Sequence, residues 1–140
     1  MSATEMMLKM SLSSQIEITR MVGDGKISMQ AGFIMNYMII KSVERLMGAC
    51  PVPASEIRHA MGVKSPAIGY KYLNEAIDAG LLQAFKSVGL TTVYRPRFDN
   101  ILQECDPFFI GSDTWVAECR ARRKDESAEI IETMHSLRRL

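Results

Sequence analysis

The sequence predicts one mainly α-helical domain with a small β-hairpin, in the α+β class. A chain of 140 residues has room for a single core of ordinary size. Its 47% hydrophobic and 24% charged residues are typical of a globular protein that buries a core, and not of a disordered chain. Helix caps recur along the chain, whereas one pair of β-prone runs flanks a short turn.

The N-terminal segment, residues 1–27, is predicted to be an arm that contains one helix. Residues 1–13 are rich in methionine and serine and fit an arm, a short helix or a strand equally well. Ser14 and Glu17 have the spacing of a capping box, so we expect a helix from Gln15 to Val22 that ends at Gly23. The β-branched residues of the same run also suit a strand, which stays open as an alternative.

A long apolar helix is predicted from Met29 to Met47. Ser28 occupies its N-cap position, and Gly48 follows its end. The apolar arc extends almost all the way round its N-terminal half, and such a helix is buried on most sides by its own fold or by a second subunit. The residues expected at an interface with a second subunit are Phe33, Ile34 and Tyr37.

Two short helices joined by a turn are predicted next. The prolines of the segment 50–53 interrupt the long helix. Ala54 to Met61 then reads as a short helix that Gly62 closes. Ser65 is an N-cap residue followed by a proline, which predicts a second helix from Pro66 to Ala79.

The rest of the chain is predicted to contain a hairpin and a terminal helix. Leu81–Lys86 and Thr91–Arg97 are β-prone runs separated by four residues, which indicates an antiparallel hairpin. Residues 98–111 are expected to be irregular, apart from a short helix around Ile101–Cys105. From residue 112 or 113 the chain is expected to be helical, with an apolar stripe that packs on a second subunit or back on its own core. The stripe residues expected in a dimer interface are Trp115, Val116, Ile130, Met134 and Leu137.

The charges of the chain balance overall but are unevenly distributed. Seventeen basic and sixteen acidic residues give a formal net charge of +1, so no general excess attracts nucleic acid or a membrane. Residues 55–97, the middle third of the chain, contain six basic and three acidic residues and are therefore its basic part. A basic surface is therefore expected to be local to it.

The number and spacing of the cysteines and the length of the apolar runs indicate the cellular compartment of the protein. Cys50, Cys105 and Cys119 are odd in number and widely spaced, which indicates a reducing compartment and argues against disulfides or a structural zinc site. The longest apolar run is broken by Asn36 and Lys41, and no signal-peptide pattern is present. We expect a cytoplasmic protein without a membrane segment, a metal or a cofactor.

The order of long helix, short helix, turn, helix and hairpin resembles the winged helix-turn-helix of bacterial, phage and plasmid transcription regulators. The resemblance covers residues 29–97 and is sharpest from Val52 to Leu82. It implies a DNA-binding domain over residues 28–97, preceded by the segment 1–27 and followed by a linker and dimerisation helix over 98–140. The residues that match buried positions of the motif are Ile57, Met61, Ile68, Leu73 and Ile77.

The helix from Pro66 to Ala79 has a polar side that suits DNA reading in the major groove. In that groove asparagine pairs with adenine, lysine donates to guanine and alanine contacts the thymine methyl group. Free N–H groups at the start of the helix also suit a phosphate. The residues expected to contact DNA here are Lys64, Ser65, Ala67, Tyr70, Lys71 and Asn74. The opposite, core side is expected to contain Ile68, Gly69, Tyr72, Leu73, Ala76 and Ile77. A merely solvated polar face is the alternative.

The hairpin has cations and threonines close to its turn. Such residues suit loose contacts with the DNA backbone or the minor groove. The residues expected to contact DNA from the hairpin are Lys86, Thr91, Thr92, Arg95 and Arg97. Basic residues on an exposed strand edge also protect against aggregation, which is the alternative reading.

No pattern in the sequence is typical of an enzyme. The two histidines, His59 and His135, fall in separate predicted helices and have no catalytic partner at a recognisable spacing. We therefore expect a homodimeric regulator that binds duplex DNA sequence-specifically. Two alternatives stay open: a winged-helix adaptor that binds proteins through a methionine-rich surface, and a plasmid or phage replication or partition protein that binds DNA.

Overall fold

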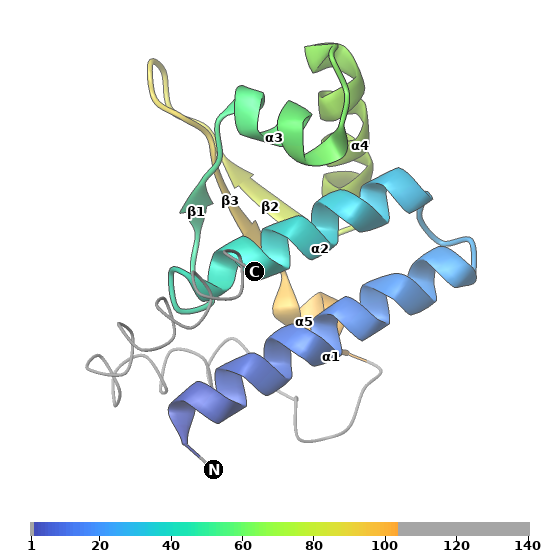
Figure 1. Ribbon diagram of the computed structural model, residues 1–140, viewed down its shortest axis with the longest axis vertical. Helices are drawn as coiled ribbons and strands as arrows, with labels where there is room; N and C mark the ends of the chain where they lie inside the picture. The colour runs from blue at the N-terminus through green and yellow to red at the C-terminus, as the bar shows by residue number, and fades with distance from the viewer. Residues whose placement is uncertain (1, 104–140) are drawn as a thin grey trace.

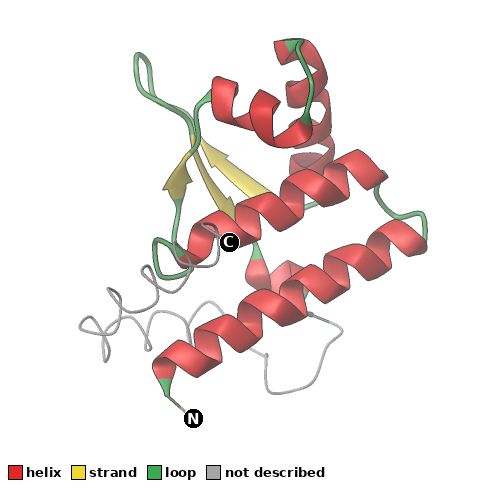
Figure 2. Ribbon diagram, in the orientation of Figure 1, coloured by secondary structure: helices red, strands yellow, loops and turns green. Residues whose placement is uncertain are grey.

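The computed structural model describes residues 2–103, which form five helices and one three-stranded antiparallel sheet (Figures 1 and 2). The α+β class is as predicted. The helix expected from residue 112 lies outside the described residues. The elements in chain order are α1 (Ala3–Gly23), α2 (Met29–Val43), β1 (Cys50–Pro51), α3 (Ala54–Met61), α4 (Pro66–Asp78), β2 (Leu82–Phe85), β3 (Val93–Pro96) and α5 (Phe98–Ile101).

Helix α1 corrects the prediction for the N-terminal segment. Ser2, and not Ser14, is its N-cap, because the Ser2 hydroxyl accepts a hydrogen bond from the Glu5 backbone N–H at 3.1 Å. Ser14 lies in the middle of the helix and is fully buried, so both the capping box and the strand alternative are wrong. Met7, Met10 and Ile18 share the buried side with Ser14 at helical spacing, and they join the core of the following elements.

Helix α2 begins as predicted but ends earlier. The Ser28 hydroxyl accepts a hydrogen bond from the Ala31 backbone N–H at 3.1 Å, which confirms the N-cap. The helix ends at Val43, after which a tight turn follows in which Leu46 and Met47 adopt left-handed φ angles of 55° and 63°. This conformation is costly for residues with a Cβ, and it persists here because the turn buries Met47 completely. The prediction of a helix up to Met47 is therefore wrong.

Helices α1 and α2 run side by side and make a close contact at Gly32 (Figure 1). A Cβ built on Gly32 would lie 2.5 Å from Cγ2 of Val22, so the contact has no room for a larger residue. Gly32 is buried in α2 and Val22 is half-buried in α1. The absence of a side chain at position 32 therefore sets how near the two helices lie.

Strand β1 was not predicted, because the prolines around it indicated only the end of a helix. It pairs with β3, with Cys50 opposite Tyr94, and the strand order is β1-β3-β2. Pro51 is tolerated because β1 is an edge strand, where a missing N–H costs little. The predicted hairpin is confirmed as β2 and β3, with shorter strands and with residues 86–92 as its loop.

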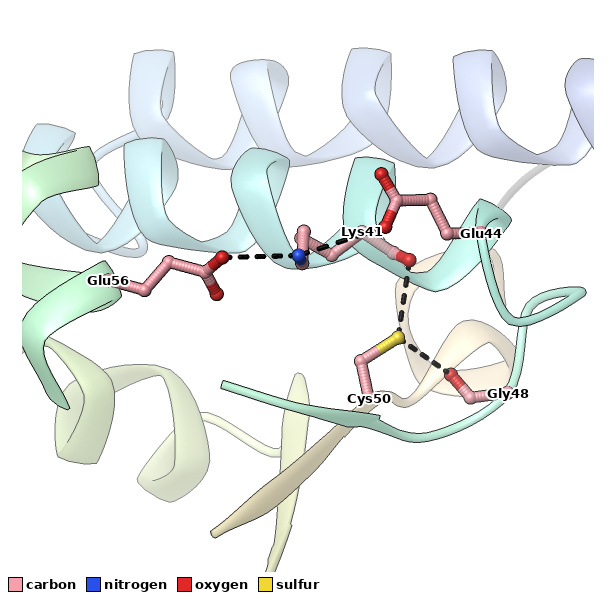
Figure 3. Close-up of polar contacts among 5 residues, drawn as sticks. All are labelled: Lys41, Glu44, Gly48, Cys50 and Glu56. Atoms are coloured by element: carbon pink, nitrogen blue, oxygen red, sulfur yellow. Dashed lines mark hydrogen bonds and ion pairs between the residues drawn. The ribbon is translucent and has the colours of Figure 1, made fainter. Parts of the chain in front are cut away.

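A polar cluster ties β1 to its neighbours (Figure 3). The Cys50 thiol donates hydrogen bonds to the carbonyl oxygens of Lys41 at 3.2 Å and Gly48 at 3.9 Å. The Lys41 ammonium lies 3.2 Å from a carboxylate oxygen of Glu56 in α3 and 3.7 Å from one of Glu44. The end of α2, strand β1 and helix α3 are thus connected through the side chain and the backbone of Lys41.

The two middle helices agree with the prediction to within one residue. Helix α3 ends at Gly62, whose φ of 66° is left-handed and suits glycine. Helix α4 begins with Pro66 at its first position and follows Ser65, which stands at the N-cap position without a side-chain capping bond.

Helix α5 extends the core beyond the predicted domain boundary at residue 97. It begins at Phe98, three residues before the short helix expected around Ile101–Cys105. Phe98, Ile101 and Leu102 are all buried, and α5 packs against α1. Residues on both sides of the predicted 28–97 domain therefore contribute to one core.

Candidate nucleic-acid interface

Helix α4 presents the exposed side that the sequence predicts. Ala67, Tyr70, Lys71 and Asn74 are all exposed, as is Asp78 at the end of the helix. The buried residues of the opposite side are Gly69, Leu73 and Ala76, whereas Tyr72 and Ile77 are half-buried.

The prediction that Ile68 belongs to the core is wrong, because its side chain is 44% exposed. Helix α3 packs against the neighbouring position, where a Cβ on Gly69 would lie 3.5 Å from Cγ2 of Ile57. Ile68, the residue before Gly69, points in a different direction around the helix axis, so its side chain lies outside the contact with α3. The exposed side of α4 therefore includes an apolar residue that the sequence predicts for the core side.

Lys71 makes a contact within its own helix. Its ammonium nitrogen lies 5.5 Å from the centre of the Tyr72 ring, which is a cation–π distance. Lys71 stays exposed, so this contact orients the charge without removing it from solvent.

The turn before α4 contains Lys64 and is contacted by the side chain of Arg58 from α3. An Arg58 guanidinium nitrogen donates a hydrogen bond to the carbonyl oxygen of Lys64 at 3.5 Å, which joins α3 to the exposed turn. Lys64 is exposed, and Ser65 beside it is half-buried. A basic residue on a short helix gave no sequence signal that its side chain reaches this turn.

A groove of about 370 Å³ lies between the hairpin loop, residues 52–54 at the start of α3 and the side chain of Tyr70 from α4. Tyr70 of α4 lines it together with Thr91 and Thr92 of the hairpin, so three residues that the sequence predicted separately meet there. Tyr94 lies in the same groove: burial raises the pKa of its phenol, nearby Tyr70 raises that pKa further, and a hydrogen bond with the Thr92 side chain lowers it. The phenol of Tyr94 is therefore uncharged at neutral pH.

The basic residues of the hairpin are not brought together. Lys86 is exposed at the start of the hairpin loop, directly after β2. Arg95 is half-buried in β3 opposite Gln83. Arg97 is exposed at the other end of the hairpin, where its backbone N–H donates to the carbonyl oxygen of Leu81 at 2.9 Å. Five strand steps put Arg97 roughly 16 Å from Thr92.

The tip of the hairpin is apolar, whereas the contacts predicted from the sequence are its basic residues and threonines. Val88 is fully exposed and Leu90 is 72% exposed. Gly89 between them has a left-handed φ of 75°, and the Leu90 backbone N–H donates to the carbonyl oxygen of Ser87 at 3.1 Å, which closes the turn. The loop thus combines two exposed aliphatic side chains with flanking polar residues.

The three residues of α2 that the sequence predicts at a dimer interface differ in how exposed they are. Phe33 is 63% exposed and Tyr37 is half-buried, whereas Ile34 is fully buried in the core of the described chain. Ile34 is therefore unavailable as a surface residue, which corrects its assignment. The predicted interface residues outside the described part are Trp115, Val116, Ile130, Met134 and Leu137.

Neither a metal site nor a membrane-spanning helix is found within residues 2–103. Within residues 2–103, no three His, Cys, Asp or Glu side chains gather as a metal site would require. None of the helices in this part of the chain combines the length and apolar character needed to cross a bilayer.

Comparisons with protein-family models, curated proteins and solved structures found no match to this chain.

Proposed function

We propose that this chain is a winged helix-turn-helix protein that binds duplex DNA sequence-specifically as a homodimer and regulates transcription. The single observation that carries the proposal is the groove shared by Tyr70 of α4 and Thr91 and Thr92 of the hairpin. Because both elements line one groove, a helix inserted in the major groove would bring the hairpin loop to the adjacent backbone or minor groove. The element order and the strand order β1-β3-β2 support the same reading.

The exposed side chains of α4 have the chemistry for reading base edges. The B-DNA major groove, about 12 Å wide, admits an α-helix. Asn74 could pair with adenine, Lys71 could donate to guanine, and Ala67 could contact a thymine methyl group. Lys64 and Arg58, at the start of the helix, suit the phosphates beside the groove.

Selection from a random pool of DNA duplexes, followed by a salt titration, tests this proposal. We expect enrichment of a defined sequence and an affinity that falls linearly with the logarithm of salt concentration, with a slope of about 0.9 per phosphate contacted. Lys64→Ala should lower this slope by about one. Lys26→Ala is the matched control, because it removes an exposed lysine from the turn between α1 and α2.

Two results would contradict the proposal. The first is an absence of binding to any duplex at low salt by a folded protein. The second is binding that Lys64→Ala and Lys26→Ala weaken equally, since it would reflect net charge and not this surface.

A protein-binding adaptor is the second candidate, and the apolar hairpin tip favours it. Val88 and Leu90 are exposed in a loop that would otherwise be expected to be polar. An adaptor would lose partner affinity when Leu90 is replaced by serine and would bind no DNA. Replication or partition of a plasmid or phage would use the same DNA surface, and the recovered sites, repeated or single, distinguish it from regulation.

A further inference from the structure

The loop between β2 and β3 ends in the hairpin tip, defined as Val88, Gly89 and Leu90. Figure 1 shows this loop projecting away from the helices. Val88 is fully exposed and Leu90 is 72% exposed, while Gly89 turns the chain between them. A single exposed aliphatic residue needs no explanation, but here two stand together at the end of a projecting turn. The surroundings of the tip indicate which partner they suit.

The hairpin that presents the tip has no acidic side chain. Residues 79–98 contain three basic residues and no Asp or Glu, although acidic residues are almost as numerous as basic ones in the whole chain. Lys86, at the start of the loop, is exposed. Charge complementarity therefore favours a polyanionic partner, and the tip requires that this partner also offer an apolar surface.

The tip borders the surface that would hold DNA. Gly89 and Leu90 line the same groove as Tyr70 of α4. Thr91 and Thr92 follow the tip directly, and they line this groove as well. A duplex seated on the exposed side of α4 would therefore have its sugar–phosphate backbone beside these hydroxyl groups, and the tip would face the next groove of the duplex.

We propose that the hairpin tip inserts into the minor groove between two base pairs and kinks the duplex. Negative phosphates surround stacked apolar bases in DNA, and this is the combination that the hairpin complements. Proteins that bind the minor groove often insert an aliphatic side chain between base pairs and bend the DNA by roughly 20–90°. A pyrimidine followed by a purine unstacks most easily, so we expect the tip to lie at such a step. The proposal rests on the DNA binding of the proposed function and adds DNA bending to it.

A membrane and a protein are poorer matches to the hairpin tip. The side chains of Val88 and Leu90 together have fewer apolar carbons than one myristoyl chain, which by itself binds membranes only marginally. A protein interface of standard size involves about 20–30 residues on each partner, and its apolar centre is wider than two side chains on a turn. Insertion at one base step needs only a narrow aliphatic wedge, which the tip provides.

Energy transfer between dyes at the two ends of the duplex recovered by selection measures the bend. We expect the unaltered full chain to kink this duplex by roughly 20–90°. Leu90→Ser and Val88→Ser should each reduce the bend, because a short polar side chain cannot replace the stacking that insertion breaks. Leu12→Ser is the matched control: it removes a leucine of similar exposure, 62%, from α1, and it should leave the bend unchanged. Circular dichroism establishes that the variants are folded.

The fluorescence of 2-aminopurine locates the insertion. This adenine analogue is quenched while it is stacked, so placing it at successive positions of the duplex reports which base step opens. We expect fluorescence to rise at one step on binding, and Leu90→Ser should remove the rise. Leu90→Ser should leave the salt dependence of binding unchanged, because no phosphate contact is lost, whereas Lys86→Ala should lower its slope by about one.

Three results would overturn the insertion and leave the proposed function in place. The first is a duplex that is bound specifically but stays straight. The second is a bend that both Leu90→Ser and Val88→Ser leave unchanged. The third is binding to vesicles that contain phosphatidylserine, lost in both variants while the DNA bend persists, which would assign the tip to a membrane. A folded chain that binds no duplex would instead refute the proposed function, and the insertion with it.

Discussion

Glu75 of α4 holds the start of α2 through Ser28. Its two carboxylate oxygens accept hydrogen bonds from the Ser28 backbone N–H at 2.7 Å and from the Ser28 hydroxyl at 2.8 Å. The same hydroxyl accepts from the Ala31 N–H, so it caps α2 while it donates to α4. A negative charge at a helix N-terminus is favourable, because the first N–H groups there are unpaired and partly positive. The exposed side of α4 is thereby oriented relative to the core helix.

Removing this contact should destabilise the fold. Glu75→Ala leaves the half-buried N–H of Ser28 without its charged acceptor, and we expect a loss of about 2–3 kcal/mol in the free energy of unfolding. Urea denaturation measures it. Asp78→Ala, at the exposed end of the same helix, is the control and should change the stability by less than about 0.5 kcal/mol. Equal effects of the two substitutions would mean that the contact contributes nothing specific.

Gly32→Ala should separate α1 from α2. The new methyl group would meet Val22, and overpacking of this kind costs about 1–3 kcal/mol. Thermal or urea unfolding measures the loss, and Val22→Ala in the same chain should recover part of it. Gly23→Ala is a matched control, since a Cβ there would meet no atom within 4 Å. A Gly32→Ala variant as stable as the Gly23→Ala variant would show that the helices can move apart freely.

Asn74→Ala tests the reading side of α4. If Asn74 contacts a base edge, its loss should weaken specific binding by about 1–3 kcal/mol and relax the preference at one base position. Competition binding against single-base variants of the selected duplex measures both effects. Unchanged affinity and unchanged preference, in a folded variant, would exclude Asn74 as a base reader.

Stability should fall at alkaline pH. Burial raises the pKa of the Cys50 thiol above its usual value of 9.0 and that of the Tyr94 phenol above 10.0. Below pH 9.0 the Cys50 thiol is protonated in both the folded and the unfolded chain. Above it, the unfolded chain releases the proton first, so the free energy of unfolding decreases as pH rises, and Tyr94 adds to the decrease above pH 10.0.

Denaturation at several pH values measures this dependence. Cys50→Ala should flatten the slope just above pH 9.0, and Tyr94→Phe should flatten the slope above pH 10.0. The same slopes in these variants as in the unaltered chain would assign the alkaline loss to other groups.

Local signals in the sequence predicted much of the fold. Ser28 caps α2 through its own hydroxyl, and Gly62 ends α3 through its own left-handed φ, so each signal acts within a few residues. The end of α2 differs, because the core and not the local sequence holds Leu46 and Met47 in left-handed conformations. Helix α1 was missed in part because the buried Ser14 interrupts its apolar stripe.

The candidate site also has some features that the local sequence predicts and others that depend on packing between elements. A helical wheel was sufficient to predict that Tyr70 and Asn74 are exposed, because exposure on a helix follows its period. The groove that Tyr70 shares with Thr92, and the reach of Arg58 to the turn before α4, depend on how separate elements pack. No pattern within one element contains that information.

Strand β1 has a consequence for the order in which the molecule folds. The β2–β3 hairpin closes through the short loop 86–92, whereas β1 precedes α3 and α4 in sequence and pairs with β3 only after both helices have folded back. Closing the longer loop costs more chain entropy, so we expect β1 to dock late. Pulse-labelling hydrogen exchange should therefore protect the Val52 N–H, which donates to the Thr92 carbonyl, after the hairpin amides. Val52 also lines the groove beside Tyr70, so a folding intermediate without β1 would have an incomplete groove.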